Sequence, residues 1–178
     1  MRGLPSKSTA TDTDALSPAL MQGEVGWRRK LPLAALTNLQ DLNLDFLPVR
    51  DLAPLAALTA LRKLGLARTQ VGDLAPLAAL TALQVLSFRN TQVSDLAPRA
   101  ALTALESLNF ANTQVSNLAP LAALTALKVL WCNNTLVSDL APLAALPELK
   151  HVYVESESRR NALAKTLGHG GNIVKESS

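Results

Sequence analysis

The sequence has very few residues of the types that carry out chemistry. Of its 178 residues one is cysteine and two are histidine, which excludes an intrachain disulfide, and no Cys/His spacing suits a metal ion. Aromatic residues make up 3% of the chain and hydrophobic residues 48%, so the core must be built from leucine, alanine and valine. We therefore predict no catalytic site, no metal site and no cofactor.

Long apolar segments are also missing. Polar residues interrupt the hydrophobic ones every few positions, so no segment approaches the ~20 apolar residues of a membrane-spanning helix, and we expect no membrane partner. The first residues, MRGLPSKSTATDTDALSPAL, show no apolar stretch of the kind found in secretory signal peptides. We expect a cytoplasmic protein, or one delivered into another cell as an effector.

Charge of either sign is scattered. The formal net charge is +3 and the pI is about 9.3, with small basic clusters at 28–30 and 62–68 among acidic residues. A solvated surface explains this pattern better than a nucleic-acid interface does, so nucleic acid is disfavoured as a partner.

The chain does contain one phrase that returns every 22 residues. From Leu52 it reads LAPLAALTALRKLGLARTQVGD. The same frame begins again at four later positions, with a partial copy before it: Leu74, Leu96, Leu118, Leu140 and Leu33. A fixed period between 20 and 29 with L-x-x-L-x-L inside it indicates a stack of identical units that share one core.

Each unit has two halves with different periods. Residues 63–67 alternate apolar and polar, which predicts a short strand with Leu64 and Leu66 facing the core and the other three facing out. Stacked copies of this strand would form a parallel sheet. The segment 52–61 instead has leucines three residues apart, which predicts a 3₁₀ turn or a short, tight helix.

Residues at equivalent positions of successive copies form columns, and other columns of the repeat predict how the two halves are joined. Asp or Asn before the helical half is a helix cap, and proline follows in the first turn, where a missing N–H costs little. A threonine column is expected to hydrogen-bond the backbone of the neighbouring turn, and a valine column to fill the core below that turn. These columns are Asp51, Asp73, Asp95, Asn117 and Asp139; Thr69, Thr91, Thr113 and Thr135; Val49, Val71, Val93, Val115 and Val137.

Two positions depart from their columns. Cys132 stands where the other copies have Leu66, Phe88 and Phe110, so we expect a small buried hydrophobic residue rather than a nucleophile. Arg99 stands in a leucine column, and we expect its stem to lie along the surface with its head in water.

The phrase DLAPLAALTALxxLxLxxTxV, seen at Asp73–Val93, resembles the bacterial internalin-type 22-residue leucine-rich repeat over about residues 31–154. The resemblance implies an α/β repeat solenoid, a leucine-rich-repeat horseshoe with a parallel concave sheet and short 3₁₀ or helical convex segments. It also implies protein binding along the concave sheet. This chain differs in having threonine where asparagine is usual, and it shows no signal peptide or cell-wall anchor, so we do not expect a surface adhesin.

The expected organisation has four parts. Residues 1–15 are predicted to be a disordered tail, 16–31 an N-terminal cap in which Trp27 covers the first repeat, and 32–154 the repeats. Residues 155–178 are predicted to form a C-terminal cap with a helix over Ser158–Leu167 and a strand over Asn172–Val174. The glycines between these two elements follow a helix, which is typical of a C-cap rather than a phosphate loop.

Because the core columns hardly vary, any binding specificity must lie in the outward columns of the strands. The central outward-facing residue of each strand forms one column, called here the central lane. Trp131 and Tyr153 are the only large residues in this lane, which is otherwise small and polar, and they should be neighbours on adjacent strands. Two alternatives stay open: the pair forms only a cross-strand contact, or a C-terminal segment covers it. The predicted protein-binding residues are Trp131, Tyr153, Asn109, Ser87, Arg89, Asn133, His151 and Glu155.

The function expected from these observations is a non-enzymatic module that binds a protein or peptide on its concave face. The sheet face is small, on the order of 300 Å², so the ligand is a peptide, or the rim contributes, or the chain self-associates. An enzyme would need a catalytic domain for which the repeats and caps leave no room. The alternative is a recognition fragment of a larger bacterial effector or sensor whose catalytic domain is absent from this chain.

Overall fold

The computed structural model describes residues 37–97, 101–155, 161–162, 164–165 and 172–175. The expected N-terminal tail, the N-terminal cap with Trp27, and the Arg99 position lie outside the described residues.

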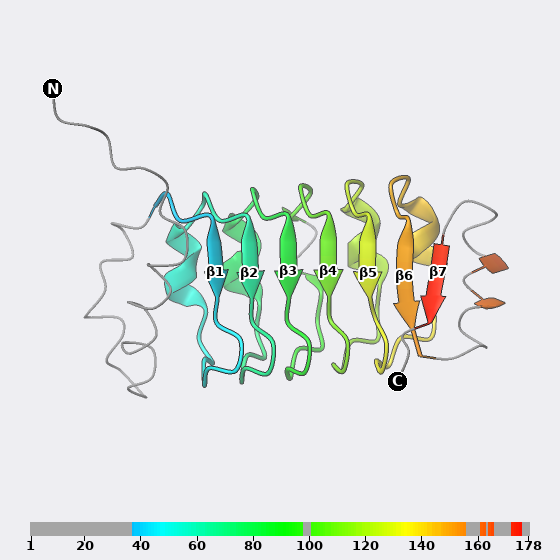
Figure 1. Cartoon of the computed structure of the whole chain (residues 1–178), viewed down its shortest axis with the longest axis horizontal. Helices are drawn as coiled ribbons and strands as arrows, with labels where there is room; N and C mark the ends of the chain where they lie inside the picture. The colour runs from blue at the N-terminus through cyan, green and yellow to red at the C-terminus, as the bar shows by residue number, and fades with distance from the viewer. Residues whose placement is uncertain (1–36, 98–100, 156–160, 163, 166–171, 176–178) are drawn as a thin grey trace, which may run out of the picture.

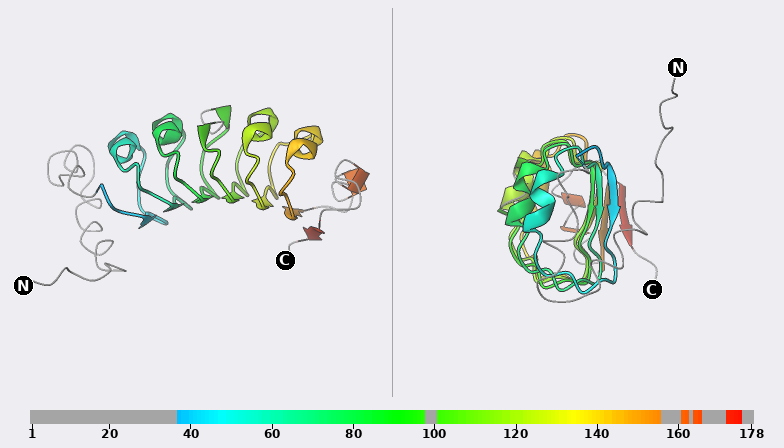
Figure 2. Two further views of the ribbon diagram at one scale, coloured as in Figure 1. Left: turned by 90° about the horizontal axis from the view of Figure 1, so that it is seen from above. Right: turned by 90° about the vertical axis from the view of Figure 1, so that its left-hand side faces the viewer.

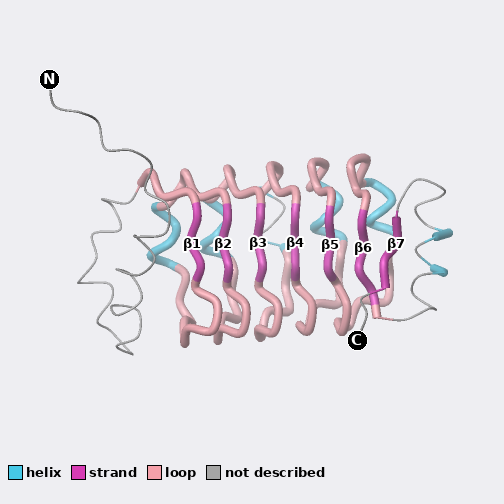
Figure 3. Tube along the Cα trace, viewed as in Figure 1, coloured by secondary structure: helices cyan, strands magenta, loops and turns pink. Residues whose placement is uncertain are grey.

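Seven parallel strands form one sheet in which the spatial order follows the chain order (Figures 1 and 3). Their bounds are β1 Asp41–Asn43, β2 Lys63–Gly65, β3 Val85–Ser87, β4 Ser107–Asn109, β5 Val129–Trp131, β6 His151–Val154 and β7 Asn172–Lys175. From β1 to β6 the register pairs residues that occupy the same place in successive repeats, such as Leu64 with Leu86. The parallel sheet predicted from the repeat is therefore confirmed.

The leucines spaced three apart form the predicted 3₁₀ turns. These turns are η2 Ala53–Ala57, η3 Ala75–Ala79, η5 Ala119–Ala123 and η6 Ala141–Ala145. In η2 the N–H of Leu55 donates to the carbonyl of Leu52, and the N–H of Leu58 donates to that of Leu55, both at 2.9 Å. The same spacing also places these leucine side chains in the core, so one period fixes both the backbone bonds and the burial.

The strands and the 3₁₀ turns form two layers of a curved solenoid. In the view from above, the strands line the inner side of the arc and the turns lie on the outer side (Figure 2). Because the turns are wider than extended strands, stacking them spreads the outer layer and curves the sheet inward. The sheet is thus the concave face that the resemblance implies.

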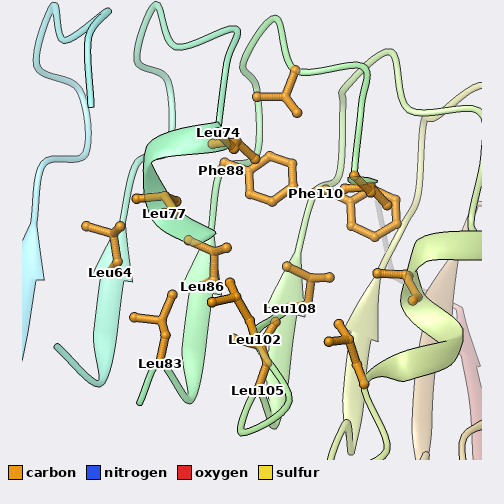
Figure 4. Close-up of a cluster of buried hydrophobic side chains, with 14 of the residues drawn as sticks. Leu64, Leu74, Leu77, Leu83, Leu86, Phe88, Leu102, Leu105, Leu108 and Phe110 are labelled. Atoms are coloured by element: carbon orange, nitrogen blue, oxygen red, sulfur yellow. The ribbon is translucent and has the colours of Figure 1, made fainter. Parts of the chain in front are cut away.

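Leucine and phenylalanine side chains fill the space between the layers (Figure 4). Leu86, Leu108 and Phe110 have no measurable exposure, and the rings of Phe88 and Phe110 stack with centroids 6.1 Å apart. Each such side chain contributes about 1.5–3 kcal/mol by leaving water. Since every repeat buries its apolar side against its neighbours, the core is continuous along the array.

The aspartate column satisfies the start of each 3₁₀ turn. Each side chain accepts the backbone N–H two residues later, at 2.7 to 2.9 Å, as Asp51 does from Ala53. The cap position itself is held by the following leucine, such as Leu52, whose side chain makes no cap bond. The predicted capping bond is therefore present, one residue earlier than in an ordinary N-cap.

The threonine column bonds differently from the expectation. Each buried hydroxyl donates to the carbonyl three residues earlier in its own repeat, as Thr91 does to Phe88 at 2.7 Å. Neighbouring turns are joined instead by backbone bonds, such as the one from the N–H of Gln70 to the carbonyl of Val49 at 2.9 Å. A hydroxyl is too short to replace the asparagine amide, so it closes its own turn.

The strands are shorter than the alternating pattern predicts. β2 ends at Gly65, and Ala67, expected to face outward, is only 1% exposed. The chain begins to turn after Gly65, so strict alternation stops there and the alanine is covered. Ala111, which follows β4, is covered in the same way.

Two glycines offer a matched test of the concave surface. A Cβ on Gly65 would lie 2.8 Å from Oδ1 of Asp45 and 2.9 Å from Oδ1 of Asn43, whereas a Cβ on Gly72 would have no atom within 4 Å. Both oxygens already accept backbone N–H groups, from Ala67 and Asp45. The side chains of Asn43 and Asp45 therefore occupy the space that a Cβ at position 65 would need.

Gly65→Ala is expected to lower the free energy of unfolding by about 1 kcal/mol, because the added methyl group displaces at least one of these hydrogen bonds. Gly72→Ala should leave stability unchanged or raise it by about 0.4–1 kcal/mol, since alanine restricts the unfolded chain. Urea denaturation of both variants checks the difference, and equal stabilities would show that Asn43 and Asp45 move aside at no cost.

At the C-terminal end β7 extends the sheet parallel to β6, with Val174 opposite Tyr153. This strand is one residue longer than the expected 172–174. Helical residues occur at 161–162 and 164–165, inside the segment expected to be a helix.

Candidate functional site

The concave face carries one pair of large side chains on adjacent strands. Trp131 of β5 and Tyr153 of β6 are register partners, and their rings stack with centroids 4.9 Å apart and an angle of 8° between their planes. Both side chains are half-buried. Parallel strands in register point equivalent side chains the same way, so the repeat itself brings the two rings face to face.

Small side chains lie beside this pair in the same lane. Gly65, Ser87 and Asn109 occupy the equivalent positions of β2, β3 and β4, and all three are half-buried. Asn109 is the register partner of Trp131. Trp131 therefore stands next to a part of the sheet that carries short side chains. The face of its indole that is not stacked on Tyr153 is turned toward them.

The start of β5 and β6 adds an apolar residue and a set of cations. Val129 and His151 are register partners and half-buried. One residue earlier, Nζ of Lys128 lies 2.8 Å from Oε2 of Glu106, while Lys150 is exposed. Since this ion pair is more than a third exposed, it adds little to stability.

Some residues predicted to bind a partner have bonds within the fold. Oδ1 of Asn109 accepts the N–H of Ala111 at 3.1 Å, and Oε2 of Glu155 accepts that of Asn134 at 3.2 Å. Asn133, expected to face outward, is only 7% exposed, and its Oδ1 is buried with no hydrogen-bond partner. Asn133 is thus covered for the same reason as Ala67, whereas Arg89 in the same column is exposed.

The hydrogen bond that Glu155 accepts ends a series of backbone hydrogen bonds between successive repeats. In earlier repeats the N–H at this position donates to a backbone carbonyl of the next repeat, as Asn112 does to Asn133 at 2.9 Å. At Asn134 the carboxylate of Glu155 takes the place of that carbonyl.

Glu155→Ala is therefore expected to speed amide hydrogen exchange at Asn134, because the N–H loses its acceptor. Glu155→Gln keeps an oxygen acceptor and should retain most of the protection. Exchange followed by NMR measures this directly. Equal rates in wild type and both variants would mean that the carboxylate does not protect this N–H.

Sequence reasoning expected the rim, including Arg68, to contribute to binding, but it missed the contact between Arg68 and Phe46 beyond β1 and β2. Five residues that follow the strands have left-handed backbone: Phe46, Arg68, Asn90, Asn112 and Asn134, with φ between 53° and 65°. The guanidinium carbon of Arg68 lies 5.4 Å from the centroid of the Phe46 ring. The sequence signal for this contact was that phenylalanine and arginine stand at the first two places of a column that holds asparagine in the later repeats.

The described residues offer no arrangement suited to metal binding, since no group of three or more His, Cys, Asp or Glu side chains comes together among them. In the same part of the chain no helix has the length and hydropathy needed to cross a membrane. Cys132 is buried, with its Sγ 3.5 Å from the carbonyl oxygen of Tyr153, as expected for a core residue.

Comparisons with known proteins agree with this architecture. The family model for leucine-rich repeats in two copies matches residues 81–123 and 103–145. A comparison with curated proteins found no match.

Solved structures give three informative neighbours. Internalin C2 of Listeria monocytogenes is 33% identical with a TM-score of 0.70, covering 82% of this chain and 65% of that one. An internalin F from the same species is 26% identical with a TM-score of 0.64, covering 83% and 50%. A leucine-rich-repeat protein of Leptospira interrogans is 18% identical with a TM-score of 0.63, covering 80% and 44%, which shows the fold alone.

The chain spans about two-thirds or less of the length of these neighbours. Its period, its parallel sheet, its 3₁₀ turns and these matches lead to one conclusion: the chain is a leucine-rich-repeat protein of the internalin type.

Proposed function

We propose that the chain is a non-enzymatic protein-interaction module that holds a short protein segment against β4, β5 and β6 on its concave face. Leucine-rich-repeat proteins are in general binding scaffolds, which supports the coarser part of this proposal. The observation that carries the finer part is the stacked pair of Trp131 and Tyr153 beside the short side chains of β3 and β4.

The physical reasons concern both rings. Tryptophan and tyrosine dominate the energetics of interfaces because they bury large apolar areas while keeping a polar group at the edge. Stacking already restricts both rings before a partner arrives, so little side-chain entropy is lost on binding. Asn109 and Ser87 leave space next to Trp131 into which a partner side chain fits.

Size favours a short ligand. A face of six short strands offers on the order of 300 Å², well below the ~800 Å² per partner of a standard interface. An extended peptide or a single loop of a protein matches this area better than a flat protein surface does.

A selection experiment tests the proposal. Peptides chosen from a displayed random library on the wild-type protein are re-screened against a Trp131→Ala/Tyr153→Ala variant and against Leu136→Ala. Leu136 is 64% exposed but follows the strand rather than facing out from it, so it serves as the control. We expect most enriched peptides to stop binding the double variant and to bind the Leu136→Ala control as they bind the wild type. Peptides that bind all three proteins equally would contradict the proposal.

One observation supports a second arrangement. The chain covers only 44–65% of the neighbouring structures, so the module also fits as the recognition part of a longer effector or sensor. In that arrangement the same concave face would select the target for another domain.

A further inference from the structure

We propose that Phe46, Arg68 and Arg89 form a second contact site, which binds an acidic segment of a protein partner. The inference rests on the proposed function only in that the chain binds proteins. It involves a different part of the sheet from Trp131 and makes no use of that residue.

Backbone conformation is the first argument. Asparagine tolerates a left-handed backbone better than other side chains do, and Asn90, Asn112 and Asn134 occupy three of the five left-handed positions. Phe46, at φ 65°, and Arg68, at φ 56°, occupy the other two without that advantage. A bulky residue that keeps a strained conformation needs a gain from elsewhere.

Burial does not supply that gain. The Phe46 side chain is 63% exposed, one of two large hydrophobic side chains so exposed among the described residues. The ring contacts the guanidinium of Arg68, an interaction that is weak at an exposed site. Neither the core nor the backbone therefore explains a phenylalanine here, whereas a surface that contacts a partner does.

The two arginines lie side by side. The N–H of Arg68 donates to the carbonyl oxygen of Arg89 at 2.9 Å, so their backbones run next to each other in adjacent repeats. Both residues are exposed. Phe46 covers one face of the Arg68 guanidinium and leaves its N–H edge for a carboxylate, which two such N–H groups bind in a fork.

Charge at this rim is not neutralised within the described chain. The ion pairs among the described residues join Lys63 to Asp41 and Lys128 to Glu106 at the other end of the strands, and neither arginine takes part. Asp45 is the acid nearest in sequence to Phe46, and one of its oxygens accepts the N–H of Ala67 at 2.7 Å. The site thus presents two cations and an aromatic ring, which complements carboxylates next to an apolar side chain.

The surrounding acids decide between an acidic peptide and a nucleic acid. The exposed capping residues Asp51, Asp73 and Asp95 follow the same loops, one in each repeat. A long polyanion that crosses several repeats would pass these carboxylates and be repelled. A short acidic segment needs only the two arginines and the ring, so the occupant we infer is a protein segment.

Fluorescence anisotropy with a defined probe tests the site. The probe is a labelled peptide in which glutamates flank one phenylalanine, and its control has glutamines instead. The wild-type protein should bind the glutamate peptide about tenfold or more tightly than the glutamine peptide at low salt. Arg68→Gln/Arg89→Gln should lose that preference, whereas Arg62→Gln/Lys150→Gln removes the same charge elsewhere and should keep it.

Two further variants separate this site from structural effects and from the aromatic pair. Phe46→Asn should weaken the glutamate peptide while the melting temperature stays the same or rises, because asparagine suits the left-handed backbone. Trp131→Ala should bind the glutamate peptide as the wild type does.

Several results would overturn the inference. They are no binding of the glutamate peptide by the wild type, equal binding of both peptides, or equal losses in the two charge variants. Loss of binding in Trp131→Ala would assign the peptide to the other site. A single-stranded oligothymidylate that competes more strongly than the peptide would show that the arginines select phosphates.

Discussion

Phe110→Ala is expected to lower the free energy of unfolding by about 3–5 kcal/mol, a large part of the stability of a small domain. The side chain is fully buried and stacks on Phe88, so its removal leaves a cavity between two repeats. That cavity has little scope to collapse, because backbone bonds such as the one from Phe110 to Trp131 hold neighbouring strands at a fixed spacing. Urea denaturation followed by circular dichroism measures the loss.

Phe110→Leu is the matched control. The same column holds Leu66 in an earlier repeat, where it is fully buried, so leucine suits the local backbone. We expect a loss well below that of the alanine variant. If alanine and leucine cost the same small amount, the two phenylalanines do not join their repeats and the core is not continuous at this place.

Trp131→Ala is expected to weaken peptides selected on the concave face by about thirtyfold or more, equivalent to about 2 kcal/mol. The indole is half-buried and stacks on Tyr153 at the surface of the sheet, so its removal takes away an anchor without opening the core. Titration calorimetry gives the affinity and thermal unfolding checks the fold. A melting temperature near that of the wild type is part of the expected result.

The control for this variant removes an equally apolar side chain from another place. Leu136→Ala deletes an exposed residue that follows β5 and should leave the affinity unchanged. Affinity retained in Trp131→Ala would mean that the stacked rings stabilise the sheet and do not bind the peptide. Affinity lost in both variants would point to an indirect effect of the loop after β5.

Most of the fold follows from the sequence because one period sets several bonds at once. The spacing of Leu52, Leu55 and Leu58 predicts both the 3₁₀ bonds and the buried faces, and the structure has both. The aspartate column predicted a capping bond, which is present. Alternation failed at Ala67 because the strand ends two residues earlier, and strand ends depend on how repeats stack rather than on polarity.

The candidate site was less accessible to sequence reasoning. The register of a parallel stack predicted that Trp131 and Tyr153 would be neighbours, and they are. The pattern gave no sign that Asn109 and Glu155 accept backbone N–H groups, since an outward polar side chain suits either role. Phe46 was missed because its strain depends on a backbone angle, although the asparagines in its column were visible.

The uniform spacing of the strands makes the sheet a molecular ruler. Each repeat adds one strand, about 4.8 Å, between the rim of β2 and the stacked rings of β5 and β6. Removing residues 96–117 joins Asp95 to Leu118 in the same frame and shortens that distance by one step, with Arg68, Arg89 and Trp131 kept. A ligand that reaches both places would therefore be selected by its length, and gain or loss of whole repeats would change that length in fixed increments.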